Sequence, residues 1–297
     1  GLLMPVLLYV EQGSGAVNHY NKITLNIGSG SNDRLDVTSV VFTATNDFLI
    51  MNSGTFNLQN TAANNLLMAS SNGTYTIAGK TGILINNANS VVGFNGNVQL
   101  DGILKLTSGT INIGNGINEN LNFNGGTLTV EGGSLNIAGR YYNTNINTIS
   151  LFTISGGTIT VPTSGSSATG QSPFYIDSPG ATYTMTGGTI VIQSEGGAGA
   201  QNLGFSVTGV SSSTVTGGTL QIGNSSTGSG QVMKINSIVP VGNLLINSVN
   251  ATGQLQTNPL TVINDVTISA GAYDPNNLTT TLGGNWTQNS TFIPGTG

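Results

Sequence analysis

The acidic residues are the first candidates for chemistry in this chain of 297 residues. Glycoside cleavage usually needs two carboxylates on opposite sides of the scissile bond. Asp101 and Glu119 are the candidate pair, because their separation in sequence could place them on successive turns of a repeating structure. Like charges held close together would perturb one pKa. Lys105 lies near and could form an ion pair with Asp101 instead, and we predict that the chain is not an enzyme.

Histidine and metal chemistry have less support. His19 is the only histidine, so a Ser-His-Asp triad could form only around it, in a stretch without a nucleophile elbow. We interpret His19 as an exposed loop residue. Cysteine is absent, which excludes metal sites built from His and Cys clusters. Asp33 and Asp36, in "GSGSNDRLD", could offer oxygen ligands to calcium, but so few acids favour a solvated turn. We therefore predict no catalytic residue, metal or cofactor.

Binding is better supported than catalysis, through an aromatic pair in the longest polar insertion. Arg140, Tyr141 and Tyr142 begin the stretch "RYYNTNINTIS". Exposed rings beside hydrogen-bonding Asn can stack on the faces of sugars, so these three residues are the predicted binding site. The alternative is that both tyrosines fold over an open side of the structure as lids. Trp286, the only tryptophan, lies in "GGNWTQN" and is expected to pack half-buried at a turn.

The composition excludes other classes of protein. Only 6% of the residues are charged, whereas an ordinary globular domain has about 25%, and 44 residues are Gly. The net charge is -5 and the six Lys and Arg residues are scattered singly, which leaves no basic surface for nucleic acid. The opening "GLLMPVLLYV" is too short to span a bilayer and lacks the flanks of a signal peptide, so we interpret it as an apolar strand or cap.

A short repeat dominates the second half of the chain. The stretches "FTISGGTITV" at 152–161, "YTMTGGTIVI" at 183–192 and "STVTGGTLQI" at 213–222 are near copies. Apolar and polar residues alternate on either side of a glycine pair, as in strands with one face buried. The glycines would form a corner, where positive φ or a close backbone approach excludes side chains. The predicted corner glycines are Gly54, Gly73, Gly109, Gly125, Gly126, Gly156, Gly157, Gly187, Gly188, Gly217 and Gly218.

The spacing of these corners predicts a stack of coils. If the threonine after each glycine marks the same corner, the steps from Thr127 to Thr158, Thr189 and Thr219 are nearly equal. Thr55, Thr74 and Thr110 would mark the earlier corners. Such periods favour an all-β, right-handed parallel β-helix (β-solenoid) with coils of about 18–31 residues, whereas propeller blades need more residues and leucine-rich repeats need a helix-compatible half.

The predicted stack places particular residues side by side. Residues 1–48 would form N-terminal strands or a cap, and residues 49–297 the β-helix, continuing into a larger parent protein. Outward threonines can order water in ice-binding solenoids, but the row Thr158, Thr189, Thr219 is flanked by Thr160, Val191 and Gln221, so a second row breaks. We therefore do not favour ice binding. The predicted interior columns are Ile154, Met185 and Val215, and Ile159, Ile190 and Leu220.

The C-terminal part carries a resemblance. Residues 258–297, "NPLTVINDVTISAGAYDPNNLTTTLGGNWTQNSTFIPGTG", resemble a segment common in very large surface and secreted proteins of the Bacteroidetes, many of them exported by the type IX secretion system. The stretches "TVTGGTLQIGNSSTGSGQ" at 214–231 and "INSIVPVGNLLINS" at 235–248 are similar to the region that precedes it. The resemblance implies a bacterial cell-surface or extracellular location, a β-helical passenger region, and roles in adhesion, gliding motility or polymer contact. It supplies no catalytic motif.

These observations favour a structural and adhesive segment of a surface protein. A stiff stalk that displays rows of Asn, Thr and Ser would contact glycans or other cell surfaces through many weak hydrogen bonds. Two alternatives stay open. One is a polysaccharide-processing β-helix enzyme, either a lyase or a glycoside hydrolase. The other is a secretion passenger bound to outer-membrane export machinery.

Overall fold

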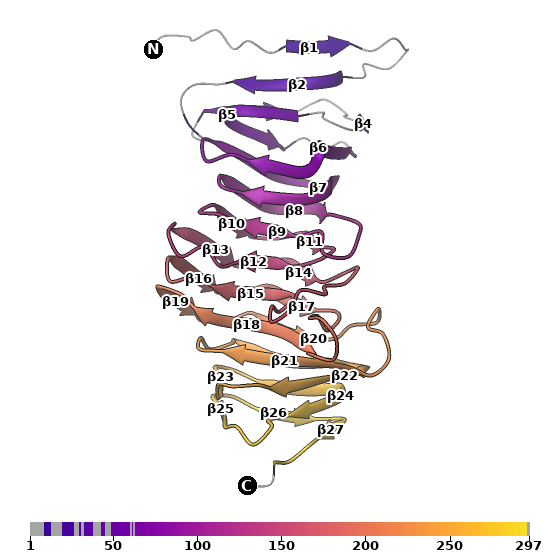
Figure 1. Cartoon of the computed structure of the whole chain (residues 1–297), viewed down its shortest axis with the longest axis vertical. Helices are drawn as coiled ribbons and strands as arrows, with labels where there is room; N and C mark the ends of the chain where they lie inside the picture. The colour runs from indigo at the N-terminus through magenta and orange to yellow at the C-terminus, as the bar shows by residue number, and fades with distance from the viewer. Residues whose placement is uncertain are drawn as a thin grey trace.

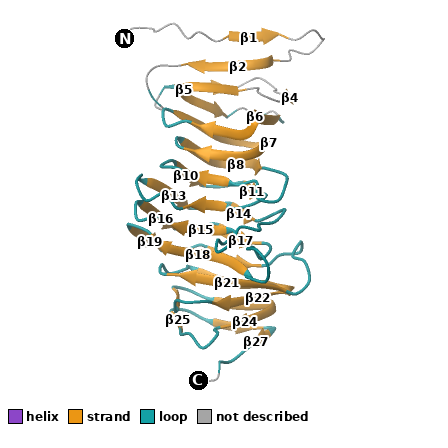
Figure 2. Ribbon diagram, in the orientation of Figure 1, coloured by secondary structure: helices purple, strands orange, loops and turns teal. Residues whose placement is uncertain are grey.

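The described part of the chain is all β. The computed structural model describes residues 9–12, 20–26, 30, 33–37, 43–44, 49–59, 61 and 63–295, and these contain 27 strands and no helix. Figure 1 shows the strands stacked along the long axis, with β1 and β27 at opposite ends of the stack. Loops and turns lie mainly at the sides of the stack, where the chain changes direction (Figure 2). The predicted all-β class is confirmed.

The parallel strands fall into three columns, which we name A, B and C in the order in which the chain visits them. Column A contains β3 (Arg34–Val37), β5 (Leu49–Leu58), β7 (Thr81–Leu100), β8 (Ile103–Ile113), β10 (Thr127–Val130), β13 (Ser150–Ile154), β16 (Ala181–Met185) and β19 (Ser212–Val215). Column B continues from β7 and β8 and adds β4 (Thr43–Ala44), β6 (Asn65–Ile77), β11 (Ser134–Ile137), β14 (Thr158–Val161), β17 (Thr189–Ile192), β20 (Thr219–Ile222), β22 (Asn243–Leu255), β24 (Val266–Asp274) and β26 (Trp286–Gln288). Column C shares β6, β7, β22 and β24 and adds β9 (Leu121–Phe123), β12 (Tyr141–Asn143), β15 (Phe174–Asp177), β18 (Leu203–Gly209), β21 (Gln231–Ser237) and β27 (Thr291–Phe292).

The remaining strands lie at the ends of this arrangement. At the N-terminal end, β1 (Tyr9–Gln12) pairs antiparallel with β2 (Tyr20–Asn26), and β2 pairs in parallel with β5. Near the C-terminal end, β23 (Leu260–Val262) and β25 (Thr280–Leu282) form a separate parallel pair. Because β3 and β4 already pair in parallel with β5 and β6, the parallel part of the structure includes residues on the N-terminal side of residue 49.

Some strands are long enough to bend round a corner and pair in two columns. The strand β7 pairs with both β8 and β9, and β22 pairs with both β20 and β21. These bends join columns B and C into a closed ring of twelve parallel strands, and the other strands pair outside it. The ring runs through β7, β8, β11, β14, β17, β20, β22, β21, β18, β15, β12, β9 and back to β7.

The strand register confirms the predicted interior columns. Ile154 pairs with Met185, which pairs with Val215, and the first two are buried. The other predicted column, Ile159, Ile190 and Leu220, pairs in the same way and is buried throughout. The sequence offset between paired residues varies from coil to coil, because the connecting loops differ in length. We call one passage of the chain through columns A, B and C a coil.

The predicted marker of a single corner is wrong for three threonines. Thr158, Thr189 and Thr219 do pair with one another, at the corner between columns A and B. Thr55 and Thr127 instead follow the corner between columns C and A, and Thr74 follows the corner between B and C. The motif Gly-Thr recurs at all three corners because each corner places the same demand on the backbone, so the motif does not tell the corners apart.

The corner glycines have the two properties predicted for them. The positive-φ members are Gly54, Gly73, Gly109, Gly125, Gly157, Gly188 and Gly218. At each of the remaining four, Gly126, Gly156, Gly187 and Gly217, a Cβ would lie 2.2–2.7 Å from a carbonyl oxygen of the preceding coil. Gly188 combines both, with φ 71° and a Cβ position 2.7 Å from the Gly156 oxygen and 2.8 Å from a side-chain carbon of Ile154. The corners therefore pack directly on one another.

An aromatic ladder fills the core between columns A and C. The Tyr141 ring stacks on Phe174 with centroids 4.6 Å apart, and Phe174 stacks on Phe205 at 5.1 Å. From column A, Phe152 stacks on Tyr183 at 5.1 Å and meets Phe174 edge-on. All five side chains are at most 1% exposed. Stacking along the axis and edge-to-face contact across it are both favourable aromatic geometries, so this ladder ties the columns together.

Replacing Gly188 with Ala tests the stacking of the corners. The change should lower the free energy of unfolding by about 2–4 kcal/mol, because positive φ costs about 1 kcal/mol and the added Cβ overlaps the preceding coil. Gly230→Ala is the matched control, because Gly230 has φ 70° but nothing within 4 Å of the added Cβ. Denaturant unfolding of both variants gives the comparison. Equal losses would show that the corners are not in contact.

Candidate functional site

An outward row of column C carries part of the predicted binding site. Backbone pairing places Tyr142 beside Tyr175, and their rings stack with centroids 6.0 Å apart. The same row continues through Ser206 and Asn236 in the next two coils. We name this surface the tyrosine face, and it consists of Arg140, Tyr142, Tyr175, Ser206, Lys234 and Asn236.

Arg140 lies against the ring of Tyr142. Its guanidinium carbon is 4.5 Å from the ring centroid, a distance typical of cation–π contact. Arg140 Nη1 donates a hydrogen bond to Gln171 Oε1, and Gln171 Nε2 donates to the Tyr142 hydroxyl at 3.1 Å. Burial lowers the pKa of Arg140, and its Nε has no hydrogen-bond partner among the described residues. Arg140 and Gln171 therefore hold the Tyr142 ring in place.

The predicted exposure of Tyr141 is wrong. Its side chain is 0% exposed and lies in the aromatic ladder, where burial raises the pKa of its hydroxyl well above the usual value. Adjacent residues of a strand point to opposite sides, so Tyr141 faces the core and Tyr142 faces outward. A pair of lids also does not describe them, because only one of the two rings is outside the core. Of these two tyrosines, only Tyr142 can contact a ligand.

An open groove of about 290 Å³ lies beside Tyr175, between column C and the loops that precede β15 and β18. Lys234 Nζ donates a hydrogen bond to the Gln201 carbonyl at 2.9 Å, which holds the ammonium at the groove. The groove thus combines an aromatic ring, an ammonium, a hydroxyl and several amides, which are groups that bind sugars. The lining residues that matter here are Tyr175, Gln201, Ser206, Lys234, Asn236 and Gln256.

The structure does not bring the predicted carboxylate pair together. Leu100 pairs with Phe123 and Val98 with Leu121, so Asp101 and Glu119 lie beyond opposite ends of β9. Gln99 Nε2 donates to Asp101 at 2.9 Å, while Glu119 accepts hydrogen bonds from backbone amides of its own loop.

The alternative partner suggested for Lys105 is also wrong. Its ammonium lies 2.7 Å from a carboxylate oxygen of Glu131, and no ion pair with Asp101 forms. The hydrogen bond from Lys105 lowers the pKa of Glu131. Column A explains this partner, because Lys105 pairs with Thr129 in the next coil and Glu131 lies shortly after Thr129.

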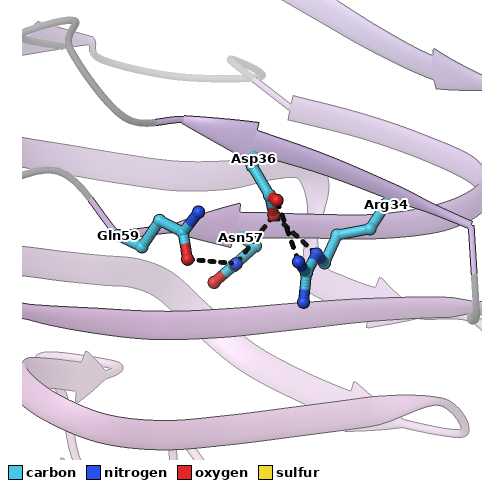
Figure 3. Close-up of polar contacts among 4 residues, drawn as sticks. All are labelled: Arg34, Asp36, Asn57 and Gln59. Atoms are coloured by element: carbon cyan, nitrogen blue, oxygen red, sulfur yellow. Dashed lines mark hydrogen bonds and ion pairs between the residues drawn. The ribbon is translucent and has the colours of Figure 1, made fainter.

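Asp36, which was considered as a calcium ligand, is held by neighbouring side chains. Figure 3 shows Asp36 between Arg34 and Asn57. The Arg34 Nε lies 2.6 Å from the Asp36 carboxylate, and Asn57 Nδ2 donates to it at 2.8 Å. Within the described ranges, no group of three or more His, Cys, Asp or Glu residues could hold a metal ion. His19 lies outside the described residues.

Column A carries a more complete threonine array than column B, on which the threonine rows considered from the sequence lie. On column B, Val191 is 5% exposed and interrupts the second row, as predicted. On column A, two outward rows run side by side through four coils. The rows are Thr129, Thr153, Thr184 and Thr214, and Thr127, Leu151, Thr182 and Ser212.

Trp286 packs near a turn, as predicted, but its side chain is exposed and not half-buried. The side chain is 39% exposed and meets Phe292 edge-on with centroids 5.1 Å apart. It begins β26 directly after the turn at Gly283 and Gly284.

Tyr175 and Lys234 are candidates that the sequence did not reveal. Tyr142 and Tyr175 are further apart in sequence than the repeat predicts, because the segment from Asn143 to Ser150 is longer than the segment from Ile176 to Ala181 with which its ends pair. A fixed step from Tyr142 therefore misses its neighbour. Counting back one regular repeat from Ser206 gives Tyr175, which is its partner in the row. Lys234 has no motif, and only its register in β21 places it beside the row.

Comparison with protein-family models, with curated proteins and with solved structures finds no match. Among the described residues there is also no helix of the length and apolarity needed to cross a membrane.

Replacing Tyr141 with Phe tests its assignment to the core. The Tyr141 hydroxyl is buried without a hydrogen-bond partner among the described residues, so its removal should raise the free energy of unfolding by about 1 kcal/mol. Tyr75→Phe is the control, because the Tyr75 hydroxyl donates to the Leu49 carbonyl at 2.8 Å and its loss should destabilise. Denaturant titration measures both. Destabilisation by Tyr141→Phe would mean that this hydroxyl has a partner after all.

Proposed function

We propose that the chain is a right-handed parallel β-helix that serves as an extracellular structural and adhesive segment of a large bacterial surface protein. The observation that carries the proposal is the in-register parallel pairing of three columns through successive coils. A connection between parallel neighbours in one sheet is right-handed in about 98% of cases, which favours this hand for the coil.

The same pairing supports a mechanical role. Each coil satisfies the backbone hydrogen bonds of the next, and the apolar core is one continuous cluster from Leu49 to Tyr273. Bending such a stack would strain backbone hydrogen bonds and core contacts in several coils at once. A stiff rod of this kind would hold binding surfaces away from a cell.

The tyrosine face supports glycan contact as the adhesive part. The stacked rings of Tyr142 and Tyr175 present aromatic surface beside hydroxyl and amide groups, as sugar-binding surfaces do. Each contact would be weak, and many copies on one cell would provide avidity.

The bacterial surface location rests on the resemblance of residues 258–297 to exported proteins of the Bacteroidetes. On this proposal the chain reaches the surface through the type IX route and binds the outer-membrane machinery only transiently, during export. The polysaccharide-processing alternative loses its specific support, because Asp101 and Glu119 lie beyond opposite ends of β9.

A glycan array tests the adhesive role. The protein displayed at high density should bind a subset of glycans without releasing cleaved products, and Tyr175→Ala should raise the half-saturating concentration about threefold to tenfold. Leu151→Ala is the matched control, because Leu151 is an exposed apolar residue on column A and should leave binding unchanged. A blank array, or equal effects of the two variants, would reject glycan contact at this face.

A second candidate function is the ordering of water at the threonine array of column A. The strand spacing of about 4.8 Å and the two-residue repeat of about 6.6 Å set hydroxyls and methyl groups in a regular grid. Such a grid can hold water in a lattice-like layer. The array is interrupted at Leu151 and ends at Lys105, which pairs with Thr129.

Ice recrystallisation inhibition tests this second candidate. The wild-type protein should slow crystal growth, and Thr184→Tyr should abolish the effect because its bulk breaks both rows of the grid. Thr160→Tyr places the same bulk on column B and should have no effect. A wild-type protein without activity removes the candidate.

A further inference from the structure

The basic residues are distributed unevenly over the structure. The described side chains include five of the six Lys and Arg residues, and two of these, Arg34 and Lys105, form ion pairs. Lys80 is exposed at a turn. The other two, Arg140 and Lys234, both lie on the tyrosine face, and neither forms an ion pair with a described carboxylate. Apart from Lys80, the unpaired positive charge of the described stack thus gathers on one face.

Lys234 is placed to bind an anion at the groove. One of its three ammonium protons is used by the Gln201 carbonyl, and the others are available to a ligand. The groove beside it is lined by neutral polar groups and the Tyr175 ring, with no acidic residue among its described lining. An ammonium that is held in place beside an aromatic ring suits a sugar that carries a carboxylate.

Neither Glu195 nor Asp177 forms an ion pair with Lys234. Glu195 accepts a hydrogen bond from the Val232 amide at 2.8 Å, so its carboxylate is committed to the backbone. Asp177 lies two residues after Tyr175 and accepts a long hydrogen bond, 3.4 Å, from the Tyr175 hydroxyl. The column register puts Lys234 on the other side of the row from Asp177. The face therefore has a positive edge and a negative edge, with the rings between them.

Arg140 extends the positive edge along the stack. Its coil is three strand spacings from that of Lys234, which is about 14 Å at the usual spacing of parallel strands. Arg140 is 9% exposed and its guanidinium packs on the Tyr142 ring. It therefore contributes positive charge next to this ring, and little direct contact with a ligand.

We propose that the groove between Tyr175 and Lys234 binds an acidic polysaccharide of the uronate class, with one sugar ring against Tyr175 and its carboxylate on the Lys234 ammonium. The proposal rests on the glycan-contact function above and names the class of glycan. The chain of sugars would run along the stack, from Lys234 toward Tyr142 and Arg140.

Oligogalacturonate and its methyl ester provide the test, because the ester keeps the sugar rings and removes the negative charge. The wild-type protein should bind the acid form at least about tenfold more tightly than the ester, and binding of the acid form should weaken as salt is added. Lys234→Gln should lose about tenfold for the acid form and little for the ester. Lys80→Gln makes the same charge change at an exposed turn and should change neither.

The outcomes separate this inference from the proposed function. Equal binding of acid and ester, or equal losses in the two lysine variants, would overturn the uronate site while leaving glycan contact in place. Binding of neutral array glycans but of neither oligogalacturonate form would do the same. Absence of all glycan binding would overturn both proposals. Retained binding of the ester by Lys234→Gln shows that this variant is folded, whereas Tyr175→Ala should weaken acid and ester alike.

Discussion

Parallel backbone pairing in register is the constraint on which the rest of this structure depends. Each strand hydrogen-bonds to the strand one coil before it and one coil after it, so residue positions repeat at about 4.8 Å along the axis. Such a stack tolerates insertions only between strands, where the loops before β15 and β18 are found. It does not tolerate a bulky residue at a corner, because the chain there passes directly over the corner of the preceding coil.

The same constraint determines what the interior and the exterior can contain. Inside, equivalent positions become columns, so an aromatic residue in one coil requires a neighbour that can stack on it, as Tyr141, Phe174 and Phe205 do. Outside, equivalent positions become rows, so a binding side chain in one coil lies beside the residues at the same position in the coils before and after it. A site on such a surface is therefore a strip along the axis more than a pocket.

Much of this could be predicted from the sequence because buried and outward residues alternate in most of the short strands. The recurrence of Gly-Gly-Thr was enough to place Ile154, Met185 and Val215 side by side. The corners were harder, because Gly-Thr satisfies the same backbone demand at all three of them. Adjacent tyrosines in a strand must point to opposite sides, so the alternation that predicted the core also implied that Tyr141 and Tyr142 could not both be exposed. The partner of Tyr142 was hidden by an insertion, since the length of a loop carries no information on strand register.

Low charge follows from the stacking as well. A charged residue at a repeated outward position would meet a like charge about 4.8 Å away in the next coil, and like charges in facing positions destabilise a sheet. The chain avoids this repulsion because only 6% of its residues are charged. Its outward rows contain Thr, Ser and Asn instead, whose neutral side chains can repeat from coil to coil. A single charge then has a strong effect on the local electrostatics, because rows of neutral residues supply few opposite charges to pair with it. Arg34 and Lys105 are balanced by acids in their own column, whereas Lys234 faces a groove of neutral groups, where a ligand can supply the missing negative charge.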